Sequence, residues 1–300
     1  MAAIRTERLS KHYGRSPALV DLDLEVEQGE VFGYLGPNGS GKTTTIRLLL
    51  GLIRPTSGRA EVLGGDAQRD VVAIHRRLAY VPGEASLWPG LTGAETLHLL
   101  GEVHGGVDIA YRDELIERFE LDPSKRVRTY SKGNRQKVSL IAALMTRSEL
   151  LVLDEPTAGL DPLMEQEFRA CVRHAQSSGQ TVFLSSHVLA EVEALCGRVA
   201  ILRAGRLVEV GSLDSMRLRS ALSVEADFGD HAVPTLSHVP GVSHVRIEAG
   251  TLRCRVEGPV SPLLAALADA GATRLVSREP TLEELFLTYY GEAREPGEGR

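Results

Sequence analysis

The stretch GPNGSGKTT, residues Gly36–Thr44, decides the fold of this 300-residue chain. It fits the pattern G-x-x-x-x-G-K-[ST], in which glycines let the backbone wrap closely around phosphate so that several N–H groups point inward. A short apolar run, Val31–Leu35, precedes the loop, and a helical pattern follows from about Lys42. The order strand, glycine loop, helix therefore predicts an α/β domain that binds a nucleotide. The alternative is a chance glycine turn before a helix.

The whole loop is a set of candidate phosphate contacts. Lys42 should neutralise the β- and γ-phosphates of ATP, and the Thr43 hydroxyl should coordinate Mg²⁺. ATP and Mg²⁺ are thus the predicted ligands, and Lys42 is also a catalytic candidate. The residues expected to hold the nucleotide are Gly36, Pro37, Asn38, Gly39, Ser40, Gly41, Lys42, Thr43 and Thr44.

Two acids end a second apolar strand, Leu150–Leu153. Asp154 is placed to hold Mg²⁺ directly or through water, and Glu155 is placed to accept a proton from an attacking water. Two adjacent acids can do both because side chains alternate in direction along a strand. The alternative is an ordinary acidic strand end.

A histidine follows a third buried strand, Thr181–Leu184, in the run Ser185-Ser186-His187. Parallel strands end on the same side of a sheet, where ligands bind. We therefore expect His187 to reach the γ-phosphate, as a third catalytic candidate. The alternative is a lone histidine with a structural role.

The composition narrows the class of protein. A hydrophobic content of 43% provides for a core, and a net charge of -6 argues against a dedicated nucleic-acid binder. The three scattered cysteines, Cys171, Cys196 and Cys254, predict neither a disulfide framework nor a metal site. No apolar run approaches the ~18 residues of a membrane helix. The chain is expected to be soluble and to need another polypeptide if it works at a membrane.

These motifs, in this order, resemble the ATP-binding subunit of ABC transporters over about residues 4–212. The segment Tyr130–Val138, YSKGNRQKV, matches the signature motif of that family, usually Leu-Ser-Gly-Gly-Gln, with Ser131 and Gly133 at the two key positions. Lys132 and Asn134 depart from the commonest form. The Tyr-Ser-Lys-Gly version resembles the subfamily that works with ABC-2-type export permeases. Without the other motifs, Ser131 would read simply as a helix N-cap.

The resemblance implies an α/β fold, namely a P-loop NTPase domain of ABC type. Such a domain has a RecA-like core, an antiparallel β-subdomain and a helical subdomain, and here a small C-terminal α+β domain follows it. The expected bounds are 4–215 for the ATP-binding domain, about 84–148 for its helical subdomain, 220–292 for the C-terminal domain and 293–300 for a disordered tail. Thr281 and Glu284 form a capping box for a last helix ending at Gly291.

Four further residues take roles by resemblance. Tyr13 occupies the place of an aromatic that stacks on adenine, although a packed strand residue is the alternative. Asp161 ends a D-loop that meets the partner site. Gly83 stands where the family usually has glutamine, so the contact of that glutamine with Mg²⁺ and its link to the permease are in doubt. Either Glu84 or water replaces it, or the position is dispensable.

By similarity, two such domains pair head to tail with two ATP molecules between them, so that Lys42 of one faces Ser131 of the other. The expected partners are a second copy of the chain and a separate transmembrane permease of ABC-2 type, with no nucleic acid. The permease would dock near Leu87, Trp88 and Leu91, unless these residues form a contact within the helical subdomain. This places the chain at the cytoplasmic face of the cell membrane, peripheral through the permease.

The predicted function is that of an ATPase, converting ATP and water to ADP and phosphate, that powers efflux of a drug or antibiotic. Two alternatives come from other classes. A soluble ABC ATPase acting in translation or DNA repair would need no permease, and a phosphoryl-transfer enzyme outside the ABC family would not need Ser131 and Gly133.

Overall fold

A computed structural model describes residues 1–218, 221–229, 231–236, 238–248, 250–279, 281–284 and 286. The chain divides into two compact units, Met1–Val210 and Gly211–Arg300. Among the described residues, every helix is too short or too polar to span a bilayer. Whether the predicted domain bounds are functional divisions stays a prediction.

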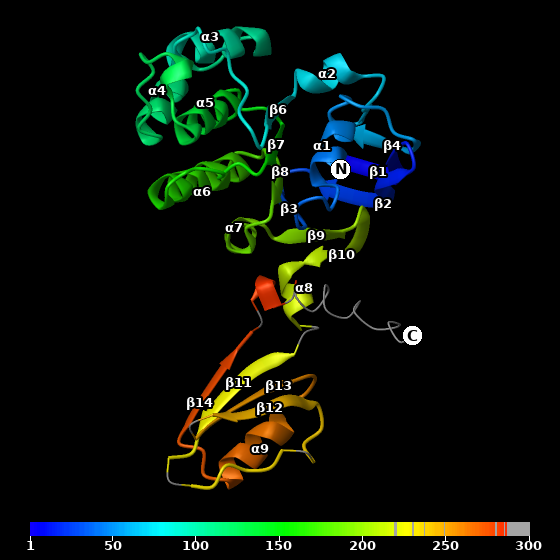
Figure 1. Ribbon diagram of the computed structural model, residues 1–300, viewed down its shortest axis with the longest axis vertical. Helices are drawn as coiled ribbons and strands as arrows, with labels where there is room; N and C mark the ends of the chain where they lie inside the picture. The colour runs from blue at the N-terminus through cyan, green and yellow to red at the C-terminus, as the bar shows by residue number, and fades with distance from the viewer. Residues whose placement is uncertain are drawn as a thin grey trace. The chain divides into compact units, whose positions relative to one another are not determined.

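A six-stranded sheet forms the centre of the first unit. Its strands are β3 (Val31–Leu35), β6 (Leu78–Val81), β7 (Leu150–Asp154), β8 (Thr181–Ser186), β9 (Arg198–Arg203) and β10 (Arg206–Ser212). They lie in the order β10-β9-β3-β8-β7-β6, and the pairs from β9 to β6 are parallel (Figure 1). The central strands β3, β7 and β8 are buried along their whole length, as their continuous apolar sequences predict for strands covered on both faces.

A second, antiparallel sheet lies beside the first one. Its strands are β1 (Ala2–Tyr13), β2 (Ser16–Glu27), β4 (Ser57–Val62) and β5 (Gly65–Asp66), in the order β2-β1-β4-β5. Leu22, Leu24 and Val26 of β2 are buried while the acidic residues between them are exposed. The alternation of apolar and acidic residues along β2 thus gives the strand one buried and one exposed face. Helix α1 (Lys42–Leu49) buries Ile46 and Leu49 in a core shared by both sheets.

The other helices of the first unit are α2 (Val71–His75), α3 (Gly93–His104), α4 (Ile109–Arg118), α5 (Lys132–Leu144), α6 (Pro162–Ser177) and α7 (Leu189–Leu195). Helices α3 to α6 each begin at a polar side chain that accepts from their first N–H groups. Thr92 and Glu95 form a capping box at α3, and Asp108 caps α4. Helices α3, α4 and α5 gather into one group away from the antiparallel sheet (Figure 1). Residues 93–144 are thus mostly helical, and they lie within the range of about 84–148 expected for a helical subdomain.

The second unit begins with α8 (Leu213–Leu218) and contains a four-stranded antiparallel sheet. Helix α9 (Ser261–Asp269) covers the sheet with the buried Leu263 and Leu267. The strands are β11 (Leu222–Asp227), β12 (Val242–Glu248), β13 (Thr251–Val256) and β14 (Arg274–Arg278), in the order β12-β13-β11-β14. This confirms the α+β character predicted from the sequence.

The predicted capping box after β14 is present. The Thr281 N–H donates to Glu284 Oε2 at 2.9 Å, and the Glu284 N–H donates to Thr281 Oγ1 at 3.3 Å. The predicted end of the last helix at Gly291 and the predicted tail, residues 293–300, lie outside the described residues.

Candidate nucleotide site

The glycine loop joins the carboxyl end of β3 to the start of α1. Gly41 adopts φ +110°, and a Cβ atom there would lie 2.7 Å from the carbonyl oxygen of Ala18. A Cβ atom at Gly36 would lie 2.7 Å from the carbonyl oxygen of Leu202 and would also strike the Ser40 side chain. Both positions need glycine because neighbouring backbone occupies the space of a side chain. The loop therefore keeps its backbone bare, as close approach to phosphate requires.

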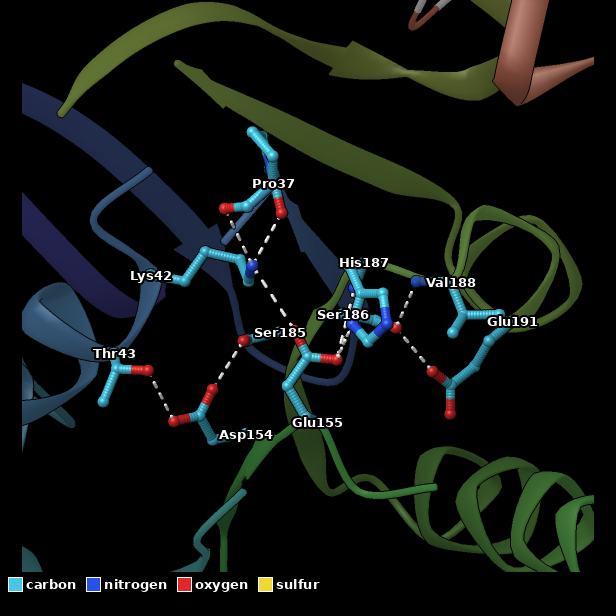
Figure 2. A network of polar contacts seen from close by, with 11 residues as sticks. Pro37, Lys42, Thr43, Asp154, Glu155, Ser185, Ser186, His187, Val188 and Glu191 are labelled. Carbon is cyan, nitrogen blue, oxygen red and sulfur yellow. Dashed lines mark hydrogen bonds and ion pairs between the residues drawn. The ribbon is translucent and has the colours of Figure 1, made fainter. Parts of the chain in front are cut away.

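The Lys42 side chain points back into this loop. Its ammonium donates to the carbonyl oxygens of Gly36 at 2.6 Å and Pro37 at 3.4 Å, and it lies 3.4 Å from Glu155 Oε1 (Figure 2). Lys42 is only 6% exposed, and Glu155 is 20% exposed. One buried cation thus faces both the loop and the end of β7, where the charge of a triphosphate would be neutralised.

Asp154 is held between a threonine and a serine. Its Oδ2 accepts from Thr43 Oγ1 at 3.0 Å, and its Oδ1 accepts from Ser185 Oγ at 2.7 Å. Ser185 was missed as a site residue, although the parallel pairing of β7 with β8 sets it opposite Asp154. Burial, together with the Asp154 carboxylate, raises the pKa of Tyr80 to about 12.

These oxygens fit Mg²⁺ bound together with a nucleotide. Such an ion takes one or two protein oxygens and completes its shell with phosphates and water. Thr43 and Asp154 offer two adjacent oxygens beside the phosphate loop. A group of three or more acids, histidines or cysteines able to hold a metal is absent from the described residues.

Glu155 and His187 meet at the ends of β7 and β8. Glu155 Oε2 lies 2.5 Å from His187 Nδ1 and accepts from the His187 backbone N–H at 3.3 Å (Figure 2). Glu155 has a positive φ of 49°, which is unfavourable for a non-glycine residue, and its N–H donates to the Ser185 carbonyl at 2.9 Å. The surrounding contacts hold a strained residue at the point where a base is predicted.

The signature segment lies at the start of α5 and packs on the D-loop of the same chain. Ser131 is an N-cap, since its Oγ accepts from the Asn134 N–H at 3.1 Å. A Cβ atom at Gly133 would lie 2.5 Å from the Gly159 carbonyl oxygen. In the described part of the chain, no hydrogen bond or ion pair joins Ser131 to the phosphate loop of its own subunit.

Two other predicted residues, Tyr13 and Asp161, lie in different surroundings. Tyr13 is half-exposed at the end of β1, with Lys11 Nζ 5.2 Å from its ring centroid, so its ring is open to a ligand. Asp161 caps α6 by accepting from the N–H groups of Leu163 and Met164, at 3.1 Å each. The tyrosine thus lacks the burial that a packed strand residue would have.

Gly83 lies beside the two acids. A Cβ atom there would be 3.3 Å from the Asp154 carbonyl oxygen and 3.6 Å from Glu155 Cβ. Glu84 is exposed, and among the described contacts it takes part in no hydrogen bond or ion pair. Its predicted role in place of the missing glutamine stays a prediction.

Together, the loop, the buried lysine and the two acids define a P-loop ATPase. A family model described as ABC transporter matches residues 19–158. The chain is 38% identical to the daunorubicin resistance ATP-binding protein DrrA3 of Streptomyces coeruleorubidus, over 97% of each chain. It is 37% identical to the bacitracin transport ATP-binding protein BcrA of Bacillus licheniformis, over 76% of this chain and 75% of that protein. The chain therefore belongs to the ABC transporter family, as an ATP-binding subunit that hydrolyses ATP.

Solved structures agree with this assignment. An ATP-binding subunit of an ABC transporter superposes with a TM-score of 0.67 at 31% identity, covering 72% of this chain and 92% of that one. The dimeric ATP-binding cassette MJ0796, in a post-hydrolysis state with ADP and Pi, gives a TM-score of 0.64 over 70% of this chain and 98% of that one. At 22% identity, that second likeness bears on the fold alone.

Proposed function

We propose that this chain powers export of a small molecule, such as a drug or an antibiotic, through a separate ABC-2-type permease at the cytoplasmic face of the membrane. The observation that carries the proposal is likeness along nearly the whole chain, second unit included, to a protein named for daunorubicin resistance. The similar proteins from Bacillus licheniformis and Cupriavidus metallidurans are named for bacitracin transport and Nod factor export. These names favour export over a soluble ABC ATPase.

The chemistry follows from the placement of the side chains. Lys42 and the N–H groups of the loop bind the β- and γ-phosphates of ATP, and Glu155 accepts a proton from the attacking water. His187, bonded to Glu155, is placed to orient the water and the γ-phosphate. Thr43 and Asp154 would hold Mg²⁺, which supplies charge neutralisation at the phosphates when bound. The Tyr13 ring would stack on adenine.

We further infer that two copies pair head to tail around ATP. The signature residues Ser131 and Gly133 start a helix whose free N–H groups suit a phosphate. They make no described contact with the loop of their own chain, so a second subunit would bring them to the γ-phosphate. Because ATP would be bound from both sides, binding would close the pair and hydrolysis would loosen it.

A cavity in the first unit suits the permease. It has a volume of about 630 Å³ and lies between the six-stranded sheet and the helical group. Leu87 and Trp88 line it, and Trp88 is 49% exposed. An amphipathic helix of the permease would bury these apolar side chains.

The decisive experiment uses Glu155→Gln in cells that also express the permease. Hydrolysis and drug efflux should both fall by about 10²–10⁴-fold, the usual contribution of a general base, while ATP binding persists. Asp113→Asn, at a carboxylate 58% exposed on α4, is the matched control and should change neither rate. Affinity purification from membranes should recover a multi-span permease. Recovery of ribosomes or DNA instead, or efflux undiminished in Glu155→Gln, would contradict the proposal.

A further inference from the structure

A buried carboxyl group lies behind the histidine and has no part in the chemistry described above. Glu191, on α7, is 1% exposed, and its Oε2 accepts from Ser186 Oγ at 2.7 Å (Figure 2). Its Oε1 makes no hydrogen bond of ordinary geometry among the described residues, and the nearby Thr157 hydroxyl only lowers the pKa of the carboxyl group. A buried acid whose second oxygen is so weakly satisfied is costly to keep, which calls for an explanation other than packing.

The Ser186 hydroxyl connects this carboxyl group to the histidine loop. Ser186 Oγ donates to Glu191 and accepts from the Val188 N–H at 2.9 Å. Ser186 and Val188 are the two neighbours of His187 in the chain, so the bonds fix the backbone on both sides of the imidazole. His187 itself meets Glu155 through its backbone N–H and its Nδ1 atom.

The surroundings of Glu191 favour the uncharged carboxyl group. Burial raises the pKa of Glu191 to about 7, although the hydroxyls of Ser186 and the nearby Thr157 lower it, and Glu155 and Glu165 raise it further. The Cys196 thiol is another titratable neighbour, and the helix α6 that packs on α7 carries Arg169, paired with Glu165, and Arg173, which donates to the Ala194 carbonyl. Because a free glutamate has a pKa of 4.5, the neutral Glu191 carboxyl group contributes to the stability of the folded chain. This contribution is fully present below pH 4.5 and is lost as the pH rises through about 7.

We propose that Glu191 is a positioning residue for His187. The neutral carboxyl group of Glu191 holds the loop of residues 186–188 in place through its hydrogen bond with Ser186. Ionisation places a further negative charge on the side of the loop away from Lys42, whose ammonium already pairs with Glu155, and the loop loosens. The histidine then loses its fixed place between Glu155 and the γ-phosphate. ATP hydrolysis by this chain would thereby respond to pH near neutrality. The inference rests on the role of His187 in hydrolysis proposed above.

Three variants of the full chain test the proposal through kcat and KM for ATP between pH 6 and 9. Glu191→Gln retains an acceptor for Ser186 but cannot ionise, so it should keep kcat at pH 6.5 and lose the decline that the wild type shows through about pH 7. Glu191→Leu and Ser186→Ala remove the two ends of the bond, and each should lower kcat about tenfold with KM little changed, because the reacting groups are misplaced. The double variant should be no worse than either single variant.

Two controls separate the possible failures. Asp113→Asn, at a carboxylate 58% exposed on α4, should leave kcat and its pH profile unchanged. His187→Ala should abolish most hydrolysis, and if it does not, the proposed role of His187 is wrong whatever Glu191 does. Should Glu191→Leu fail to fold, the other two variants still decide. The positioning role is refuted if Glu191→Gln keeps the wild-type pH profile, if Ser186→Ala keeps the wild-type kcat, or if the effects of Glu191→Leu and Ser186→Ala add.

Discussion

At the scale of single residues, the site depends on one cation with several partners. Lys42 is buried, and its ammonium is shared among the Gly36 and Pro37 carbonyls and Glu155. A phosphate entering the loop would replace neutral acceptors with charged ones, and such hydrogen bonds are about twice as strong. Lysine at this position therefore favours the triphosphate over the loop's own carbonyl groups.

Lys42→Ala should lower ATP affinity by about tenfold or more, because a hydrogen bond to a charged group contributes roughly 1.5–3 kcal/mol. Hydrolysis should fall further, since the lysine also neutralises the γ-phosphate. Calorimetric titration measures the first effect and phosphate release the second. Lys125→Ala, at a lysine 60% exposed, is the control. Equal ATP affinity in Lys42→Ala and the wild type would contradict the assignment.

A second prediction at the scale of single residues concerns Gly83 and its neighbour Glu84. A Cβ atom at Gly83 would lie 3.3 Å from the Asp154 carbonyl oxygen, a tight contact that needs a shift of a few tenths of an ångström, and 3.6 Å from Glu155 Cβ, an ordinary contact. Gly83→Gln should therefore fold, with a melting temperature slightly below that of the wild type. Glu84→Ala should reduce drug transport coupled to hydrolysis if Glu84 replaces the missing glutamine. Undiminished coupling in Glu84→Ala would rule out that replacement.

The main site residues could be predicted from the sequence because the phosphate loop and the strand-ending acids are local patterns. Lys42, Thr43, Asp154, Glu155 and His187 do converge. Ser185 and Glu191 were not predicted, because their roles depend on contacts across strands and on burial. The residues next to a serine or a glutamate in the sequence do not indicate whether it makes such a contact or is buried.

At the scale of elements, the start of α5 and the D-loop behave as one packed piece. Gly133 lies against the Gly159 carbonyl, and Gln136 Nε2, which is buried, donates to the Pro156 carbonyl at 3.0 Å. Pro156 directly follows Glu155. Helix α5 thus contacts the turn that follows Glu155, the proposed base, so a shift of one of these elements would displace the other.

Gly133→Ala should separate these elements, because the added methyl group would lie 2.5 Å from a backbone oxygen. ATP hydrolysis should fall about tenfold or more, because even a small misplacement of reacting groups slows a reaction by that much. ATP binding to the phosphate loop should be retained, which a filter-binding assay can measure. Gly90→Ala, where a methyl group meets no atom within 4 Å, is the matched control. Wild-type hydrolysis in Gly133→Ala would contradict this role.

Most elements could be predicted from periodicity, and their pairing could not. The expected strand Thr181–Leu184 is the core of β8, and its neighbour β3 lies about 150 residues earlier in the chain. Helix α6 begins at Pro162, because Asp161 at its N-cap and the proline after it favour a helix start.

At the scale of the whole molecule, the proposed closed pair can be tested by cross-linking. The natural cysteines are all buried, so introduced surface thiols would react first. In the Glu155→Gln background with the permease present, Asn38→Cys and Ser131→Cys should form a disulfide between subunits when Mg·ATP is added. Asn38→Cys with Asp113→Cys should not, because Asp113 lies on α4 and not in the signature segment at the start of α5 that is proposed to face the phosphate loop. Failure of the first pair to cross-link would refute head-to-tail closure.

The fixed shape of the glycine loop has a consequence for the energetics of ATP binding and hydrolysis. Its shape is already fixed by Gly36 against Leu202, by Gly41 against Ala18, and by the inward ammonium of Lys42. A preorganised receptor loses little conformational entropy when its ligand arrives. More of the free energy of ATP binding is then left over for drawing two subunits together, and that association is the step on which mechanical output would depend.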